Sequence, residues 1–210
     1  TAEFSRAGGG GFNAKVAGRR MGASVTDGGM LGQGMLADIA VRQLREEGIA
    51  VAVQRRAATD QGSCVVIVDR TGERSFISHH GAERQLDARH LGDVEAARYD
   101  YALLTGYSIY KEESAAAFLP WLATTEDLPP LFFDPGPTVS DIPRSALDPV
   151  LARASWISAN AHEADVLTGK HEPPRAAEEL AKGRAGAMVR AGAQGCWLAH
   201  RGAIRHVKGF

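Results

Sequence analysis

Four consecutive glycines at positions 8–11, followed two residues later by Asn13, are the residues of this chain best suited to binding a small ligand. Glycine lacks a Cβ, so the backbone N–H groups of this run can approach a ligand closely. Apolar spacing predicts a short helix after the glycines that ends near Gly22, and its positive end would face the same place. Asn13 can donate and accept hydrogen bonds. The run suits a hydroxyl-rich or anionic small molecule, and a flexible glycine loop without a ligand is the alternative.

Four further groups of polar and glycine residues each follow a short apolar run. Parallel strands bring their carboxyl ends to one edge of a sheet, where ligands collect. Turns favour such residues anyway, so a single group is weak evidence for a ligand site, whereas four groups in series are stronger evidence. The groups occupy positions 105–108, 134–136, 160–163 and 192–195.

Asn160 and Glu163 are spaced i, i+3, so in a first helical turn they share a face. An amide and a carboxylate placed this way could hold a hydrated Mg²⁺ ion near phosphates. The alternative is a capping box, in which Asn160 caps the helix and Glu163 reaches back to it. The spacing alone favours capping, and the two roles are compatible.

The remaining reactive side chains do not form a recognisable catalytic pattern. His79 and His80 are adjacent and would point apart in a strand. Cys64 and Cys196 are isolated, without the spacing of a zinc site. The sequence contains no phosphate-binding P-loop and no GxSxG nucleophile elbow.

The elements that must position these residues alternate between strand and helix. Short apolar runs predict strands at 101–105, 131–133, 156–158, 187–190 and 196–199, and helical spacing predicts helices at 36–47, 113–122, 145–154 and 175–182. Strands that are apolar on both faces and joined by helices are typical of a mainly parallel sheet. We therefore expect an α/β fold.

Residues 51–83 differ from this pattern and are predicted to form a small β-rich lid. Short β-type runs at 51–53, 64–68 and 74–77 surround the turn residues Asp69-Arg70-Thr71-Gly72, which predicts a hairpin. The core would then comprise 1–50 and 84–210. An ordinary edge hairpin of the main sheet is the alternative.

The composition and charge of the chain limit the kinds of partner and location that we expect. The chain of 210 residues has a formal net charge of -1, which indicates neither nucleic acid nor a membrane surface as a partner. No run of 18 apolar residues is present. The isolated cysteines and the absence of a secretory leader pattern at the start of the sequence favour a cytoplasmic protein.

Together these motifs resemble those of the ribokinase-like, or PfkB, carbohydrate kinases. The stretch 8–32 is similar to the family's N-terminal signature, which has a glycine pair, a further glycine, an asparagine, a helix and then another glycine. Asn160 and Glu163 match an Asn-x-x-Glu motif, and 189–192 with Gly195 resembles the segment that borders the nucleotide. The motifs follow the family order over nearly the whole chain.

The resemblance implies a three-layer αβα fold and transfer of the γ-phosphoryl group of ATP, with Mg²⁺, to a hydroxyl of a small sugar. In similar proteins the lid often forms a homodimer, and the sequence leaves the oligomeric state open. A nucleoside kinase of the same fold, or a non-catalytic sugar- or nucleotide-binding protein, is the alternative. The implied roles are sugar binding by Gly9, Gly10 and Asn13, lining of the sugar pocket by Gly106 and Tyr107, nucleotide binding by Asn160, Glu163, Gly192 and Gly195, and contact with Mg²⁺ through water by Glu163.

The chain departs from the family pattern in three ways. Lys15 stands where a small residue is usual, and Gln33 stands where aspartate is common. The family's Asp-Thr-x-Gly-Ala-Gly-Asp segment, which carries the catalytic base, is expected beyond Phe210, and a first strand with a sugar-binding aspartate is expected before Thr1. The resemblance therefore assigns no general base to any residue of this sequence.

Overall fold

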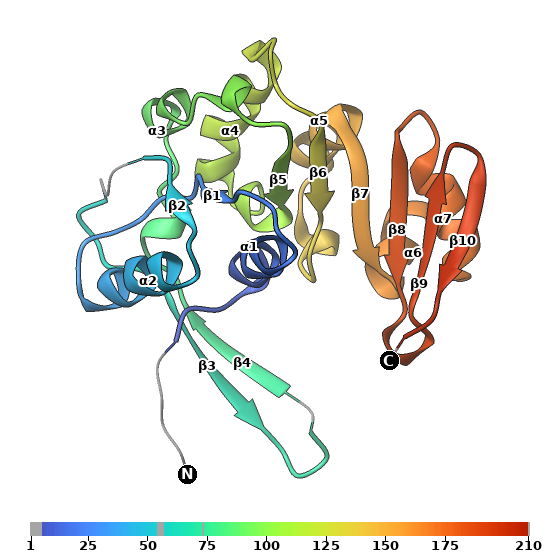
Figure 1. Cartoon of the computed structure of the whole chain (residues 1–210), viewed down its shortest axis with the longest axis horizontal. Helices are drawn as coiled ribbons and strands as arrows, with labels where there is room; N and C mark the ends of the chain where they lie inside the picture. Colours follow the sequence, from blue (N-terminus) through green and yellow to red (C-terminus); the bar gives the residue numbers. More distant parts are fainter. Residues whose placement is uncertain (1–5, 54–56, 73, 210) are drawn as a thin grey trace. The chain divides into compact units, whose positions relative to one another are not determined.

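The computed structural model describes residues 6–53, 57–72 and 74–209. The chain forms two compact units, Thr1–Val94 and Glu95–Phe210 (Figure 1).

The first unit contains two longer helices and a small parallel pair of strands. Their bounds are α1 Gly10–Arg20, β1 Thr26–Asp27, α2 Met35–Glu46 and β2 Ala50–Val51. Leu31, Leu44 and Ile49 form a buried cluster, against which Phe12 and Val16 of α1 pack. This packing explains why the apolar residues of α1 recur at helical spacing, and it leaves the start of the helix at the surface.

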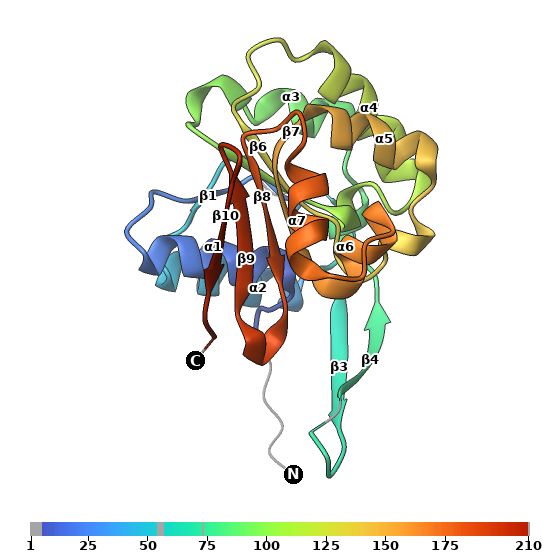
Figure 2. The same ribbon diagram turned by 90° about the vertical axis from the view of Figure 1, so that its right-hand side faces the viewer.

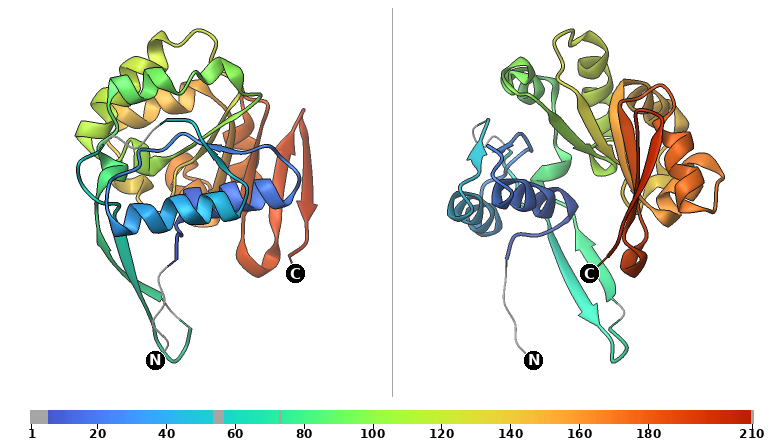
Figure 3. Two further views of the ribbon diagram at one scale, coloured as in Figure 1. Left: turned by 60° about the vertical axis from the view of Figure 1, so that its left-hand side comes forward. Right: turned by 45° about the vertical axis from the view of Figure 1, so that its right-hand side comes forward.

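A long antiparallel hairpin extends from this unit (Figure 3). Its strands are β3 Ser63–Val68 and β4 Arg74–His79, and all of their described residues are exposed. The predicted hairpin is thus confirmed, whereas the strand expected at 51–53 is observed at Ala50–Val51 and pairs with β1. A short turn of helix, η1 Ala82–Arg84, and α3 Ala88–Asp93 complete the unit. The function of 51–83 as a lid stays a prediction.

A six-stranded sheet organises the second unit, in the order β10-β9-β8-β7-β6-β5. The four strands from β5 to β8 are parallel, and β9 and β10 are added antiparallel. The predicted mainly parallel sheet is confirmed. The bounds are β5 Ala102–Thr105, β6 Leu131–Asp134, β7 Ala154–Asn160, β8 Gly186–Arg190, β9 Cys196–His200 and β10 Ala203–Val207.

Four helices connect the parallel strands of this sheet: α4 Glu112–Thr124, α5 Arg144–Arg153, α6 Ala161–Thr168 and α7 Pro173–Ala181. Each connection moves one strand in the same direction, so right-handed crossovers place all four helices on one face (Figure 2). Phe133, Ile157 and Val189 are at most 1% exposed beneath them. The opposite face carries Phe132 and Trp156, whose rings stack with centroids 5.6 Å apart. No described helix is both long and apolar enough to span a membrane.

Candidate functional site

The glycine run places an open helix start at the surface of the first unit. Gly9 is the residue before α1 and has φ +91°, a left-handed conformation that favours glycine. A Cβ on any of Gly8 to Gly11 would have no neighbour within 4 Å, so packing does not explain these glycines. Asn13 is exposed, and its N–H donates to the Gly9 carbonyl at 2.9 Å. A ligand can therefore reach the first N–H groups of α1.

Lys15 joins the same helix to the neighbouring strand. Its ammonium group donates a hydrogen bond to Oδ1 of Asp27 at the end of β1, and the two form an ion pair. The side chain of Asp27 is only 7% exposed and that of Lys15 is 23% exposed. The lysine that departs from the family pattern thus holds α1 to β1 and is not a freely solvated surface charge.

Gly106 and Tyr107 lie in the second unit, in a short helical turn after β5, η3 Gly106–Ser108. Gly106 is buried, and a Cβ there would lie 1.9 Å from the carbonyl oxygen of Pro135. Close packing against the loop after β6 is therefore sufficient to require glycine. Tyr107 is 48% exposed. The role of both residues in a sugar pocket stays a prediction.

Asn160 and Glu163 form the capping box that their spacing favours. The Asn160 Oδ1 atom accepts from the Glu163 backbone N–H at 2.8 Å, and Glu163 Oε2 accepts from the Asn160 backbone N–H at 2.8 Å. In addition, Asn160 Nδ2 donates to Glu163 Oε1 at 2.7 Å. Both oxygens of this carboxylate are therefore held where β7 ends and α6 begins, at the carboxyl edge of the sheet.

Arg190, the last residue of β8, connects this motif to the end of β6. Its Nη1 donates to Asp134 Oδ2 at 3.1 Å and to Ser158 Oγ, and its Nη2 lies 3.6 Å from Glu163 Oε2. Arg190 and Asn160 are direct partners in the strand register. The sheet thus brings two carboxylates and one guanidinium together from sequence positions as far as 56 residues apart.

Glu163 is only 2% exposed, and this burial raises the pKa of its carboxyl group. The charge of Asp134 acts in the same direction. The backbone hydrogen bond from Asn160 and the charges of Arg190 and His162 oppose the rise. Burial therefore disfavours the ionised form of the Glu163 carboxyl group, and the positive charge of Arg190 favours it.

The turn between β8 and β9 contains the two glycines expected to border a nucleotide. It includes a short helical turn, η5 Gly192–Gln194, and Gly192 has open space where its Cβ would be. Gly195 has φ +86°, and a Cβ there would lie 2.0 Å from the Val207 carbonyl oxygen of β10. The positive φ and the packing against β10 are therefore sufficient to require glycine at position 195, whereas Gly192 leaves its backbone accessible.

The donor set at the carboxyl edge fits a hydrated magnesium ion. Mg²⁺ usually binds through one or two carboxylates and completes its shell with waters and substrate phosphates. Asp134 and Glu163 are two such carboxylates. Within the described residues, no group of three or more His, Cys, Asp or Glu side chains is close enough to enclose a metal by itself.

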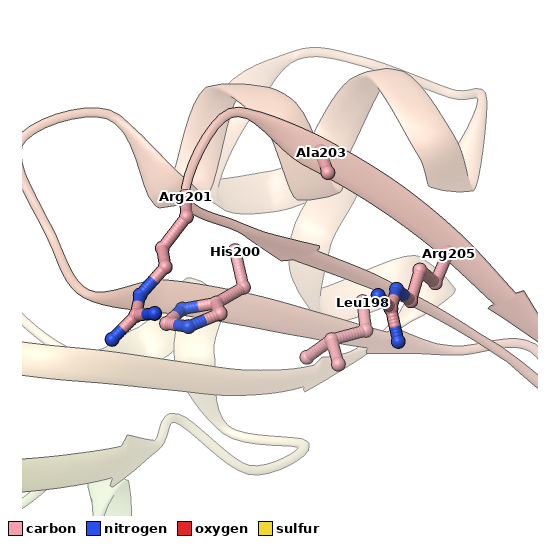
Figure 4. A pocket seen from close by; sticks show the side chains of 5 residues that line it. All are labelled: Leu198, His200, Arg201, Ala203 and Arg205. Carbon is pink, nitrogen blue, oxygen red and sulfur yellow. The ribbon is translucent and has the colours of Figure 1, made fainter.

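A hollow of about 290 Å³ lies elsewhere in the second unit, on β9 and β10 (Figure 4). It is lined by Leu198, His200, Arg201, Ala203 and Arg205. None of the residues predicted to bind substrate or nucleotide lines it, and His200 and Ala203 flank the turn at the end of the hairpin away from Gly195. This hollow is separate from the carboxyl-edge cluster.

The sequence analysis placed Asp134 and Arg190 at the ends of predicted strands, and Arg190 within the segment that resembles the nucleotide border, but it gave neither side chain a role of its own and gave none to Ser158. One signal was available: each of these charged residues ends a strand at the edge where ligands collect. Their mutual contact could not be found, because it depends on which strands are neighbours.

Comparison with known proteins identifies the family. Residues 4–210 match the family described as pfkB family carbohydrate kinase. The chain belongs to this family. Members of the PfkB family are kinases, so the predicted resemblance is confirmed. The chain is also 30% identical over 159 residues to the uncharacterized sugar kinase YegV of Escherichia coli (strain K12). That match covers 76% of this chain and 49% of YegV, so the chain spans about half the length of this curated relative.

Solved structures of kinases share the fold. The adenosine kinase from Sinorhizobium meliloti matches with a TM-score of 0.81 and 18% identity, over 93% of this chain and 62% of that one. A putative ribokinase II from E. coli in complex with ATP and Mg²⁺ matches with a TM-score of 0.76 and 20% identity, over 95% and 66% of the two chains. The predicted ribokinase-like, three-layer αβα fold is confirmed by this likeness.

Proposed function

We propose that this PfkB chain belongs to an ATP-dependent sugar kinase that transfers the γ-phosphoryl group of ATP to a carbohydrate hydroxyl. The observation that carries the proposal is the Asn160–Glu163 capping box beside Asp134 and Arg190, at the carboxyl edge of a sheet whose chain matches the family over residues 4–210. The ATP and Mg²⁺ bound to the ribokinase II relative support the choice of cofactors.

The acceptor sugar is assigned to the start of α1. There the N–H groups that follow Gly9 and Gly10 are open to a ligand, and the exposed amide of Asn13 can donate to or accept from a sugar hydroxyl. The ion pair between Lys15 and Asp27 holds the helix in place. Gly106 and Tyr107 remain proposed pocket residues of the second unit.

The phosphate end is assigned to the carboxyl edge of the sheet. Asp134 and Glu163 would hold Mg²⁺ there, Glu163 through water, and the loop that contains Gly192 and Gly195 would border the nucleotide, with an accessible backbone at Gly192. When bound, Mg²⁺ neutralises phosphate charge during the transfer. The acceptor oxygen would form its bond to the γ-phosphorus, the bond from the γ-phosphorus to the bridging oxygen would break to leave ADP, and the hydroxyl proton would pass to water. Positioning by these residues supplies most of the catalysis expected for phosphoryl transfer.

The experiment that tests this proposal is a panel of sugars and nucleosides incubated with the intact protein, ATP and Mg²⁺, with ADP release as the readout. Thermal protection by ribose, fructose or adenosine identifies the acceptor that binds. Turnover of adenosine alone would favour the nucleoside kinase, which the adenosine kinase neighbour keeps as the second candidate. Ligand protection without any ADP release would indicate a binding protein and overturn the kinase assignment.

We further propose that hairpin β3–β4 serves as a lid and joins two copies of the chain. It exposes apolar side chains on both faces: Val65 and Ile77, which are partners in the strand register, and Phe76 on the other face are each at least 60% exposed. An isolated two-stranded hairpin is marginally stable in water, so burial against a partner would stabilise it. Light scattering of the intact protein tests the dimer.

A cytoplasmic location is proposed from the two free cysteines, Cys64 and Cys196.

A further inference from the structure

We propose that Arg190 is a positioning residue for phosphoryl transfer, because it fixes the carboxylates of Asp134 and Glu163 beside each other. This inference rests on the proposed kinase function and adds to it a residue that the motifs did not single out. Arg190 acts through the two carboxylates and not on the reacting atoms.

Asp134 and Glu163 each use one set of contacts to their own loop and another contact to Arg190. Each carboxylate is tied to its own loop: Asp134 Oδ1 accepts from the Gly136 N–H at 3.1 Å, and Glu163 is held by Asn160. The other oxygen of Asp134 accepts from Arg190 Nη1, and Oε2 of Glu163 lies 3.6 Å from Arg190 Nη2. A single guanidinium therefore connects two loops that belong to different strands.

The shape of the arginine side chain makes this connection specific. Its guanidinium is a rigid planar fork whose two terminal nitrogens have a fixed spacing, so it sets the separation of the two carboxylates. Lysine places one compact charge on a flexible stem and cannot hold both groups in the same way. Ser158 Oγ accepts from the same Nη1 atom and further limits the rotation of the fork.

The charges explain what would be lost without Arg190. Two carboxylates at close range repel each other, and Glu163 is buried besides, so the pair needs a nearby cation. In its absence Asp134 would turn toward solvent, because the other hydrogen bond that its carboxylate makes among the described residues is with the Gly136 N–H. The site would then present one carboxylate where the proposal requires two.

The experiment compares Arg190→Met and Arg190→Lys with the wild type in the intact protein. Arg184→Met is the matched control, because Arg184 is a part-buried arginine of the same unit that donates to the backbone carbonyls of Leu180, Lys182 and Leu151. One readout is kcat as a function of Mg²⁺ concentration, and the other is the thermal stabilisation that ATP with Mg²⁺ produces without an acceptor.

We expect Arg190→Met to raise the Mg²⁺ concentration for half-maximal activity about 10- to 100-fold, the range seen when a partner of a metal-binding carboxylate is removed. The acceptor KM should change less than about twofold, since the substitution leaves the start of α1 intact. Arg190→Lys should recover part of the loss. Arg184→Met should lower the melting temperature and leave the Mg²⁺ dependence unchanged.

A double variant tests whether Arg190 acts through Glu163. If it does, adding Arg190→Met to Glu163→Gln should cost less than the product of the two single effects on kcat. Fully multiplicative effects would show that Arg190 acts independently of Glu163 and would overturn the inference.

The remaining outcomes separate this inference from the proposed function. If Arg190→Met only lowers the melting temperature, as Arg184→Met does, Arg190 is structural and the inference is wrong. If the wild type releases no ADP with any acceptor, the proposed function fails, and the thermal readout still decides: equal stabilisation of wild type and Arg190→Met by ATP with Mg²⁺ overturns the inference. If the wild type gains no stabilisation at all, both proposals fail.

Discussion

Replacing Asn160 by alanine should cost more than the loss of an ordinary helix cap, because its side chain makes two bonds with Glu163. Its Oδ1 accepts from the Glu163 N–H at 2.8 Å, and its Nδ2 donates to the Glu163 carboxylate at 2.7 Å. Loss of an N-cap oxygen costs about 1 kcal/mol. The lost bond from Nδ2 is a hydrogen bond to a charged group, which contributes about 1.5 to 3 kcal/mol to stability. Only part of this is lost, because the Asn160 backbone N–H still donates to the Glu163 carboxylate in the variant. We expect a total of about 2 to 3 kcal/mol.

The matched control is Asp87→Ala. Asp87 caps α3 by accepting from the His90 N–H at 2.6 Å and takes part in no reciprocal box. Its loss should cost only the ordinary cap value of about 1 kcal/mol. Asn160→Asp separates the two bonds at position 160, because it keeps the accepting oxygen and replaces the Nδ2 donor with a second negative charge beside Glu163.

The assay is urea denaturation of the intact protein at pH 7, with the free energy of unfolding of each variant compared with that of the wild type. Asn160→Asp should lose at least about 1 kcal/mol, since it converts a charged hydrogen bond into a repulsion. A loss in Asn160→Ala no larger than that in Asp87→Ala, or an Asn160→Asp variant as stable as the wild type, would refute the reasoning.

Three further predictions concern the acceptor, the buried carboxylate and the core. Asn13→Ala should raise the acceptor KM about tenfold by removing a hydrogen bond to a hydroxyl, whereas Arg20→Ala at the far end of α1 should leave it unchanged in steady-state kinetics. Glu163→Gln should lower kcat and alter the Mg²⁺ dependence. Because burial raises the pKa of Glu163, its protonation stabilises the fold below the ordinary value of 4.5, and this contribution is lost as pH rises through the raised pKa. The stability of the wild type relative to Glu163→Gln should therefore fall over that range in urea titrations, and a constant difference would contradict the assignment. Phe133→Ala, at a side chain with 0% exposure, should cost about 3 to 5 kcal/mol, and Met21→Ala, at 87% exposure outside the hairpin, less than about 0.5 kcal/mol by the same measurement.

Most of the fold could be predicted because its signals are local. The apolar runs at 101–105 and 131–133 coincide with strands β5 and β6 to within one residue at each end, and the turn residues 69–72 identified the hairpin. The elements that sequence reasoning missed have weak local signals. Strand β10 is Ala203–Val207, and four of its five residues are exposed, so no apolar run marks it. Helix α3 has only six residues, too few to show a helical period.

Sequence reasoning likewise found the parts of the site that lie close together along the chain. The spacing of Asn160 and Glu163 predicts a capping box because both residues belong to one helical turn. It could not decide that Gly106 and Gly195 are required by packing, because their close neighbours, Pro135 and Val207, come from other elements.

The sequence by itself therefore determined the family, the alternation of strands and helices, the exposed hairpin, the glycine run and the capping box. The family follows from the order of motifs along nearly the whole chain, and each of the other features depends on residue types within a few positions of one another. Only the tertiary structure decided that Arg190 meets both Asp134 and Glu163, and that Lys15 is paired with Asp27. The reason is physical: the contacts of Arg190 depend on the order and register of β6, β7 and β8, and the contact of Lys15 depends on the packing of α1 beside β1. These arrangements result from burial of apolar surface across the whole of each unit.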